Sequence, residues 1–348
     1  MADIVLAVPG DLQIRTGGYV YDSHVLAELA GRRRGAVALG LPAALPFGSE
    51  ADLTEALRRL AAVPKASTLF VDGLAYAVLP PERIRALDRP VVALCHHPLA
   101  LEGNLADDVA ARLEASERAA LTAVAHVVAT SETTAATLRD RFGVSAERLS
   151  VAEPGVAPAE RARGAESGPP TLLTVATVTP RKNHIAVARA LARMTDLDWR
   201  WRIAGSVTRD VATVEALTAE IAAAGIGDRV ELLGELSHEA IVREYAGADV
   251  FVLASRYEGY GMAYTEALAR GLPVIAGRGG ASETTVPANA GAIVDPDDVA
   301  DVEAALRRLA GDSDARRAAA GAAWAHAERL PRWSDTADVF ERVAAHVR

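Results

Sequence analysis

Two glutamates stand in the stretch of the chain that is richest in groups able to do chemistry. Glu258 lies in a glycine-containing turn, and Glu266 lies in the helix expected after it. Apolar runs of strand length, 248–254 and 273–276, flank the turn and the helix. If both glutamates were helical, their carboxylates would lie about 80° apart around the axis and ~12 Å apart along it. They therefore suit the two ends of a long ligand better than a paired acid–base site.

The turn between these glutamates has the composition of an anion site. Gly259 and Gly261 allow the backbone to approach a ligand closely, and the helix that opens near Met262 presents unpaired N–H groups at its positive end. We therefore expect Gly259, Tyr260, Gly261 and Met262 to meet a diphosphate. A sugar joined through a diphosphate to a ribose has the length that the two carboxylates require.

The block from Ser255 to Ile275 resembles the donor-site signature of the retaining glycosyltransferases of family four. The likeness is carried by Ser-x-Tyr-Glu-Gly-Tyr-Gly and then Glu-Ala-x-x-x-Gly-x-Pro-Val-Ile. The resemblance implies that Glu258 sits at the transferred sugar and that Glu266 binds the ribose hydroxyls. The glutamate spacing alone is a weak signal in a chain with 46 acidic residues, and the alternative is a solvated helix beside a packing turn.

Two cations, Arg181 and Lys182, follow the strand-like run 172–177 and precede a helix. Their charge can reach an anion at the end of that strand, whereas surface cations at a helix start are unfavourable for the helix dipole. In the resembled family a lysine of this loop binds the donor diphosphate, usually with an arginine several residues earlier. Lys182 matches the lysine, Thr177 occupies the place of the arginine, and Arg181 is the residue that could replace it.

The first half of the chain has a second glycine pair after a strand. Residues 4–8 read as that strand, and Gly17 and Gly18 precede a helix, which is another arrangement for approaching a phosphate. It lacks Gly-x-Gly-x-x-Gly, the dinucleotide fingerprint. The resemblance implies that Gly17 and Gly18 face the donor phosphate, and the alternative is a plain turn.

His96 and His97 end the strand-like run 90–95, where side chains of an open α/β sheet project toward a ligand crevice. They could be metal ligands, an acid–base pair or hydrogen-bonded loop residues. A metal is disfavoured, because adjacent residues at a strand end point apart and no further ligand cluster is visible beside them. The resemblance implies a histidine here that contacts the transferred sugar, and His96 matches its place better than His97.

Two further predictions concern a loop in the second half of the chain and a helix in the first half. The loop after the strand 229–233 holds the nucleobase through backbone contacts in the resembled family, which implies Glu235 and Leu236 here. Helical spacing over 113–123 predicts a helix with Glu114 and Glu117 on its polar side.

Alternating strands and helices in both halves predict an α/β fold with two Rossmann-like doubly wound domains facing across a cleft, the GT-B arrangement of the resembled family. We expect an acceptor-binding domain over 1–157, a linker over 158–170 that is rich in Pro, Gly and charge, and a donor-binding domain over 171–330. The C-terminal helix, about 331–348, is expected to pack back on the first domain.

The composition narrows the class of protein. With 348 residues and a net charge of −9, the chain is not expected to bind nucleic acid. The single cysteine, Cys95, excludes a disulfide framework, and no signal peptide or apolar run of membrane-spanning length is visible. We expect a soluble, cytoplasmic protein, with at most a weak peripheral membrane contact through Arg32-Arg33-Arg34.

The function implied is retaining hexosyl transfer from a GDP- or UDP-linked sugar to a glycan, lipid-linked or small-molecule acceptor. No cofactor and no metal are expected, since no Asp-x-Asp stands near a strand end, so Lys182, Arg181 and helix N–H groups would stabilise the leaving diphosphate. Alternatives are a nucleotide-sugar epimerase or hydrolase on the same fold, or an inactive nucleotide-sugar-binding protein. The missing glycine fingerprint and the missing P-loop disfavour a dehydrogenase and a kinase.

Overall fold

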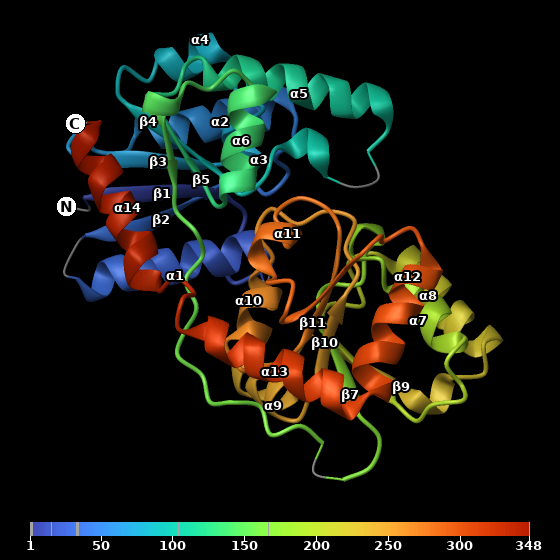
Figure 1. Ribbon diagram of the computed structural model, residues 1–348. Coiled ribbons are helices and arrows are strands. Elements are labelled where there is room, and N and C mark those ends of the chain that lie inside the picture. The colour runs from blue at the N-terminus through green and yellow to red at the C-terminus, as the bar shows by residue number, and fades with distance from the viewer. Residues whose placement is uncertain (1–2, 15, 33–34, 103–104, 166, 348) are drawn as a thin grey trace. The chain divides into compact units, whose positions relative to one another are not determined.

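The computed structural model describes residues 3–14, 16–32, 35–102, 105–165 and 167–347. The chain divides into two compact units (Figure 1). Unit 1 comprises residues 1–155 together with 331–348, and unit 2 comprises residues 156–330.

Unit 1 is built on a six-stranded parallel sheet in the order β2-β1-β3-β4-β5-β6. The strands are β1 (Ile4–Pro9), β2 (Ala36–Leu41), β3 (Thr68–Asp72), β4 (Val91–Cys95), β5 (His126–Ala129) and β6 (Leu149–Val151). Every residue of β1, β3, β4 and β5 is buried, as expected for strands covered on both faces. The strand order changes direction between β1 and β3, which makes the carboxyl ends of these two strands the switch point where open α/β sheets bind ligands.

The helices of unit 1 are α1 (Gly17–Gly31), α2 (Glu50–Ala61), α3 (Gly73–Tyr76), α4 (Pro81–Arg85), α5 (Asp107–Leu121), α6 (Glu132–Asp140) and α14 (Trp333–His346). The last helix, α14, packs beside α1 (Figure 1). In this contact the Trp333 ring stacks on His24 of α1, and α14 also reaches the sheet, where Phe340 stacks on Phe70 of β3. The end of the chain therefore completes the core of unit 1.

Unit 2 has a second parallel sheet in the order β12-β11-β10-β7-β8-β9. Its strands are β7 (Thr171–Val175), β8 (Arg200–Ala204), β9 (Val230–Gly234), β10 (Val250–Leu253), β11 (Val274–Gly277) and β12 (Gly291–Val294). Its helices are α7 (His184–Ala192), α8 (Val211–Ala223), α9 (His238–Ala246), α10 (Met262–Leu268), α11 (Ser282–Thr285), α12 (Val299–Leu306) and α13 (Ser313–Ala327). The strand order reverses between β7 and β10, so the switch point of this sheet lies at their carboxyl ends.

Helices cover both faces of the unit 2 sheet. Val250 and Val252 of β10 pack into a cluster that contains α7, α8 and α12, while Phe251 and Leu253 pack into another that contains α9 and α10. Successive side chains of a strand point to opposite faces, so this alternation places the helices in two layers. The two doubly wound sheets confirm the predicted α/β fold class.

Residues 158–170, the expected linker, have no helix or strand among their described residues. They nevertheless lie against unit 2, because the Ala162 N–H donates to the Arg270 carbonyl at 2.8 Å and the Arg163 N–H donates to the Ala246 carbonyl at 2.9 Å. The described part of this segment is thus fixed to the second unit by its backbone.

The prediction that Glu117 lies on a polar helix side is wrong. Glu117 is 0% exposed, and its carboxylate accepts hydrogen bonds from the Tyr76 hydroxyl at 2.7 Å and from the Leu99 N–H at 3.0 Å. The reason is its register on α5, where Leu113, Glu117, Ala120 and Leu121 form the buried stripe at helical spacing. The expected helix also begins earlier than predicted, at Asp107.

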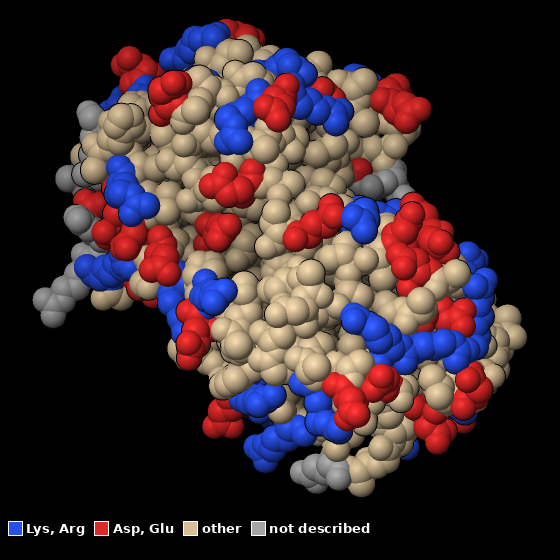
Figure 2. Space-filling model, in the orientation of Figure 1, with Lys and Arg blue, Asp and Glu red and all other residues tan. Residues whose placement is uncertain are grey.

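Basic and acidic side chains are interspersed over the visible surface (Figure 2). Arg32 is paired with Asp338 and Glu28 within unit 1, and Arg33 and Arg34 lie outside the described residues. Of the helices that the structure describes, none combines the length and the apolar character needed to cross a membrane.

Candidate functional site

The switch point of unit 2 brings Lys182 and Glu258 together. Lys182 ends a short 3₁₀ turn, η3 (Pro180–Lys182), after β7, and Glu258 lies in the loop after β10. The Lys182 Nζ lies 2.6 Å from Glu258 Oε1, and a guanidinium nitrogen of Arg181 lies 3.7 Å from the same oxygen. The two predicted cations and the first glutamate of the motif therefore form one cluster, drawn from the two strands that flank the switch point.

The backbone of the β10–α10 loop is held by a glycine turn after β11. The Ala281 N–H donates to the Glu258 carbonyl at 2.8 Å, and Glu258 pairs with Gly280 as in a parallel strand. Gly280 has a φ of +63°, and a Cβ there would lie 2.0 Å from the Glu258 carbonyl oxygen. Only glycine fits this position, so Gly280 helps to fix where the Glu258 side chain begins.

The charge state of Glu258 follows from its neighbours. The residue is 6% exposed. Burial by itself raises the pKa of its carboxyl, but the charges of Lys182 and Arg181 outweigh burial and hold the pKa below its ordinary value. Glu258 is therefore an ionised, buried carboxylate at neutral pH, while Lys182 and Arg181 add positive charge beside it.

The helix α10 opens as the sequence predicts. Gly261 precedes it with a φ of +90°, and no side chain caps its first turn. The Tyr260 carbonyl accepts a hydrogen bond from the Thr285 hydroxyl at 2.9 Å, which ties the turn to α11. Gly259 and Met262 belong to the same turn and helix start, so the four predicted phosphate contacts are neighbours of Glu258 along the backbone.

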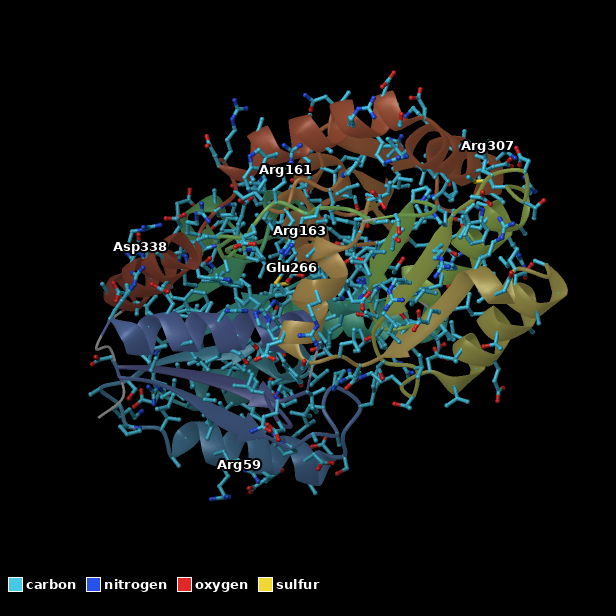
Figure 3. The ribbon with its side chains drawn as sticks, turned by 90° about the horizontal axis from the view of Figure 1, so that it is seen from below. Arg59, Arg161, Arg163, Glu266, Arg307 and Asp338 are labelled. Carbon is cyan, nitrogen blue, oxygen red and sulfur yellow. The ribbon has the colours of Figure 1, made fainter. Side chains whose placement is uncertain are left out.

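Glu266 has a different set of partners from Glu258. The Tyr245 hydroxyl donates to Glu266 Oε2 at 2.9 Å, and burial raises the pKa of the Glu266 carboxyl. The Arg270 guanidinium lies 4.7 Å from the centre of the Tyr245 ring, which adds positive charge nearby. Figure 3 labels Glu266 on α10, together with Arg161 and Arg163 on the segment that is hydrogen-bonded to unit 2.

Glu235 and Leu236 lie in the loop between the edge strand β9 and α9. Glu235 is exposed, Leu236 is half-buried, and Ser237 caps α9 by accepting from the Ala240 N–H. Their contact with a base stays a prediction.

In unit 1, His96 follows β4 and lies against the start of α1. A Cβ on Gly18 would lie 3.2 Å from Cδ2 of the His96 ring, whereas a Cβ on Gly17 would meet nothing within 4 Å. The two glycines are the first residues of α1, which Thr16 caps by accepting from the Tyr19 N–H. The expected loop is thus already helix at Gly17.

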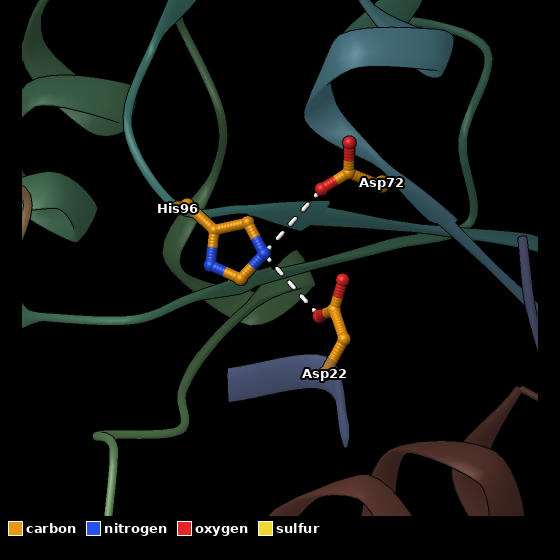
Figure 4. Close-up of side chains that lie close together, drawn as sticks. All are labelled: Asp22, Asp72 and His96. Carbon is orange, nitrogen blue, oxygen red and sulfur yellow. Dashed lines mark ion pairs between the residues drawn. The ribbon is translucent and has the colours of Figure 1, made fainter. Parts of the chain in front are cut away.

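Two carboxylates that the sequence reading missed flank His96 (Figure 4). The His96 Nε2 lies 3.3 Å from Asp22 Oδ1 and 3.4 Å from Asp72 Oδ2. The expectation that no further ligand cluster stands beside the histidines is therefore wrong. Asp72 ends the apolar strand β3, which could have signalled it, but Asp22 lies within the buried side of α1 and only the tertiary fold brings it to the histidine.

The carboxylates and the imidazole of this cluster shift one another's pKa. Burial lowers the pKa of His96, but the charges of Asp22 and Asp72 outweigh burial and raise the pKa to about 10. Burial raises the pKa of Asp22 to about 6, although the His96 charge lowers it. His97 is engaged elsewhere, with its Nε2 2.7 Å from Glu102 Oε2.

Among the described residues, Asp22, Asp72 and His96 form one group whose ligand atoms lie within 4.8 Å of one another and could hold a metal ion. A separate pocket of about 420 Å³ in unit 2 is lined by residues such as His184, Arg189 and Asp297. This pocket contains none of the predicted site residues.

Two family models match consecutive parts of the chain. The model described as Glycosyl transferases group 1 matches residues 157–324, and the model described as Glycosyltransferase Family 4 matches residues 24–160.

Sequence relatives carry related names. A GDP-mannose-dependent monoacylated alpha-(1-6)-phosphatidylinositol monomannoside mannosyltransferase of Corynebacterium glutamicum is 33% identical over 203 residues, which are 55% of this chain and 51% of the relative. A D-inositol 3-phosphate glycosyltransferase of Corynebacterium diphtheriae is 35% identical over 159 residues, 45% of this chain and 37% of the relative. The chain thus matches about half the length of the first of these relatives and less of the second.

Solved structures agree over nearly the whole chain. Sucrose-phosphate synthase from Thermosynechococcus elongatus has a TM-score of 0.81 at 19% identity, covering 99% of this chain and 98% of that one. Anabaena HepE in complex with UDP and glucose has a TM-score of 0.78 at 15% identity, covering 99% of this chain and all of the other. At these identities the likeness concerns the fold. Together with the two family models, which span residues 24–324, it shows that the chain belongs to the GT-B glycosyltransferases of family four.

Proposed function

We propose that this protein is a retaining glycosyltransferase that moves a hexose from a nucleoside-diphosphate sugar to an acceptor hydroxyl. The observation that carries the proposal is the cluster of Lys182, Arg181 and Glu258 at the switch point of unit 2, in a chain that belongs to a glycosyltransferase family. A buried carboxylate beside two cations provides both an anchor for sugar hydroxyls and charge for a leaving diphosphate.

Lys182 has two roles in this proposal. Without a donor its ammonium pairs with Glu258 at 2.6 Å. A bound diphosphate would compete for this ammonium, since phosphate oxygens are strong acceptors for charged donors. Glu258 would then be released to accept hydrogen bonds from the sugar, while Lys182 and Arg181 neutralise the leaving group without a metal.

The transfer step follows the front-face path expected for this family. The bond between the anomeric carbon and the diphosphate oxygen breaks, and the acceptor oxygen bonds to the same face of that carbon. The departing phosphate oxygen takes the proton of the acceptor hydroxyl. Glu258 and His96 orient the sugar, and no covalent nucleophile is required.

The relatives suggest which substrates to test first. GDP-mannose stands in the name of one sequence relative, and UDP occurs in the Anabaena structure. An inositol stands in the acceptor part of both relatives' names, as phosphatidylinositol mannoside or as inositol phosphate. We infer an inositol-bearing acceptor and a GDP- or UDP-linked hexose.

Ligand-dependent thermal stability tests the donor site. In the presence of EDTA, one of GDP, UDP or ADP at 100 times its dissociation constant should stabilise the protein by ~2.7 kcal/mol. Lys182→Ala and Glu266→Ala should lose this shift, whereas Glu239→Ala, an exposed glutamate of α9, should keep it. The absence of a shift with every diphosphate would refute the donor site.

The products of turnover distinguish sugar transfer from hydrolysis, epimerisation and binding without reaction. Glu258→Gln should bind the diphosphate at least as well as the wild type, because the competing carboxylate is gone, yet lose roughly 100-fold or more in kcat/KM. Sugar released to water alone would indicate a hydrolase, an interconverted nucleotide sugar would indicate an epimerase, and binding without turnover would indicate an inactive binder.

A further inference from the structure

We propose that Asp22 and Asp72 are positioning residues that hold the His96 ring as an imidazolium, so that its Nδ1–H is a fixed, charged donor. The role of this donor toward a sugar or phosphate oxygen rests on the proposed function. The two carboxylates that favour protonation of the ring both belong to unit 1.

The cluster lies at the switch point of the unit 1 sheet. Asp22 lies one helical turn after Gly18 on α1, so both face the same side of that helix. Asp72 ends β3, and His96 directly follows β4. Three elements that are separated in the sequence therefore converge on one imidazole nitrogen.

Among the residues that the structure describes, neither carboxylate has a full positive charge beside it other than a protonated His96 ring. Asp22 is 0% exposed, and among the described residues neither its two carboxylate oxygens nor His96 Nε2 has a partner in hydrogen-bond geometry, so the 3.3 Å contact between Asp22 Oδ1 and Nε2 is that of an ion pair. Asp72 uses Oδ1 to accept from the Leu74 N–H at 2.9 Å, which leaves Oδ2 toward the ring. With a neutral ring, two buried carboxylates would have no counter-charge, and this is costly in a low-dielectric interior.

Protonation of His96 supplies the missing positive charge. Two carboxylates and one imidazolium still leave one negative charge, which favours a second proton on Asp22 at mildly acidic pH. Within the described part of the chain, the charged and titratable groups that face the ring are Asp22 and Tyr21 of α1 and Asp72 of β3. The Tyr21 hydroxyl donates to the Ala152 carbonyl at 2.9 Å and adds no charge.

The ring is also fixed in orientation. Tyr21 contacts it edge to face, with ring centres 5.1 Å apart and an angle of 84°, and Gly18 lies against Cδ2. The Thr130 hydroxyl donates to the His96 carbonyl at 3.0 Å. Nε2 faces both carboxylates and Nδ1 lies on the other side of the ring (Figure 4). A neutral ring with its proton on Nε2 would offer an acceptor at Nδ1, whereas the imidazolium offers a donor.

Nitrogen NMR of the full-length protein with ¹⁵N-labelled histidine tests the protonation directly, with His96→Gln assigning the signal. Both ring nitrogens of His96 should stay protonated up to at least pH 8. In Asp22→Asn and Asp72→Asn the ring should titrate closer to the ordinary histidine pKa of about 6.5. Glu102→Gln, which removes the partner of His97, should leave the His96 titration unchanged.

A neutral His96 at pH 7.5 in the wild type, or one titration curve shared by the wild type and both Asn variants, would overturn the proposal. So would saturable binding of one Zn²⁺ or Mn²⁺ that requires Asp22, since the cluster would then hold a metal. If Asp22→Asn does not fold in a thermal melt, the wild-type curve and Asp72→Asn still decide.

Kinetics then tests the use of the donor. Asp72→Asn should shift the alkaline limb of the kcat/KM profile to lower pH, with the diphosphate dissociation constant nearly unchanged. If the protein transfers no sugar but the NMR titration behaves as expected, the proposed function fails while the assignment of His96 stands. An unshifted limb in an active enzyme would refute the role of Asp72 in catalysis.

Discussion

At the scale of single residues, the buried acids of this protein differ by their partners. Glu258 faces Lys182 and Arg181, which hold its pKa low despite burial. Glu266 and Glu117 have tyrosine hydroxyls as partners, and burial raises the pKa of each carboxyl. A carboxylate that two cations keep ionised in the interior is suited to a charged or polar ligand, whereas the fully enclosed carboxyl of Glu117 suits a structural role.

Glu117 gives a pH-dependent prediction. Burial raises its folded-state pKa to about 7, against an ordinary value near 4.5. The folded state therefore binds the proton more tightly, so the stability that Glu117 contributes is fully present below pH ~4.5. It is lost as the pH rises toward and through about 7. The total loss is on the order of 3 kcal/mol, at about 1.4 kcal/mol per unit of pKa difference.

Denaturant titrations of wild type and Glu117→Gln at several pH values check this. The advantage of the wild type over the variant should shrink between pH 5 and pH 8. Glu114→Gln on the same helix serves as the control, because its carboxylate pairs with Arg118 and Arg141 and its pKa is lowered, so its contribution should be level over that range. A constant difference for Glu117→Gln would contradict the assignment.

At the scale of elements, both candidate sites occur where a strand ends and a helix begins at a switch point. In unit 2 these are β7 with η3, and β10 with α10. In unit 1 they are β1 with α1, and β3 with α3. The carboxyl ends of parallel strands share one edge of a sheet, which explains why residues as distant in sequence as Lys182 and Glu258 meet.

Gly17 and Gly31 are the first and last residues of α1, so Gly17→Ala can be tested with Gly31→Ala as its control. A Cβ on Gly17 or on Gly31 would meet nothing within 4 Å, so alanine at either position should preserve or raise stability by a few tenths to 1 kcal/mol. If the start of α1 approaches the donor phosphate, Gly17→Ala should weaken diphosphate binding about tenfold, or ~1.4 kcal/mol. Gly31→Ala, at the far end of the helix, should bind normally.

Isothermal titration of both alanine variants with the preferred nucleoside diphosphate gives the measurement. Equal affinity in wild type and Gly17→Ala would remove Gly17 from the donor site and leave the plain-turn interpretation.

At the scale of the whole molecule, the chain does not divide simply into a first and a second half. Residues 331–348 return to unit 1, where Arg32 pairs with Asp338 and the Thr336 hydroxyl donates to the Glu153 carbonyl at 2.6 Å. Unit 1 therefore needs both ends of the chain to complete its core.

Hydrogen exchange can test this dependence. Phe340 is 0% exposed and stacks on Phe70 with ring centres 4.8 Å apart, so Phe340→Ala should cost about 3–5 kcal/mol. Amides of α1 and β3 should lose protection while those of β10 and α10 keep theirs. Trp324 on α13 is a partly exposed residue of unit 2. Trp324→Ala should lower the protection of the β10 and α10 amides by a smaller amount, and the α1 and β3 amides should keep theirs. Equal loss of protection in both units would contradict two separate cores.

The sequence by itself determined the fold class, the alternation of strands and helices along the chain, and most of the residues in the unit 2 cluster. Apolar runs of strand length, helix caps such as Ser237, and glycines such as Gly261 are local signals, because they act within a few residues. Lys182 and Glu258 could be singled out because each follows a strand, although their 2.6 Å contact could not.

Only the tertiary structure decided what surrounds His96 and Glu117. Asp22 and Glu117 are acids on helices, where a sequence pattern favours the solvent side, yet both are fully buried. Their burial depends on side chains that other elements supply, His96 after β4 and Asp72 of β3 for Asp22, and Tyr76 of α3 for Glu117. A buried charge is stable only beside its partner, and the pairing of distant segments is set by the packing of the sheet and its helices, which local periodicity does not encode.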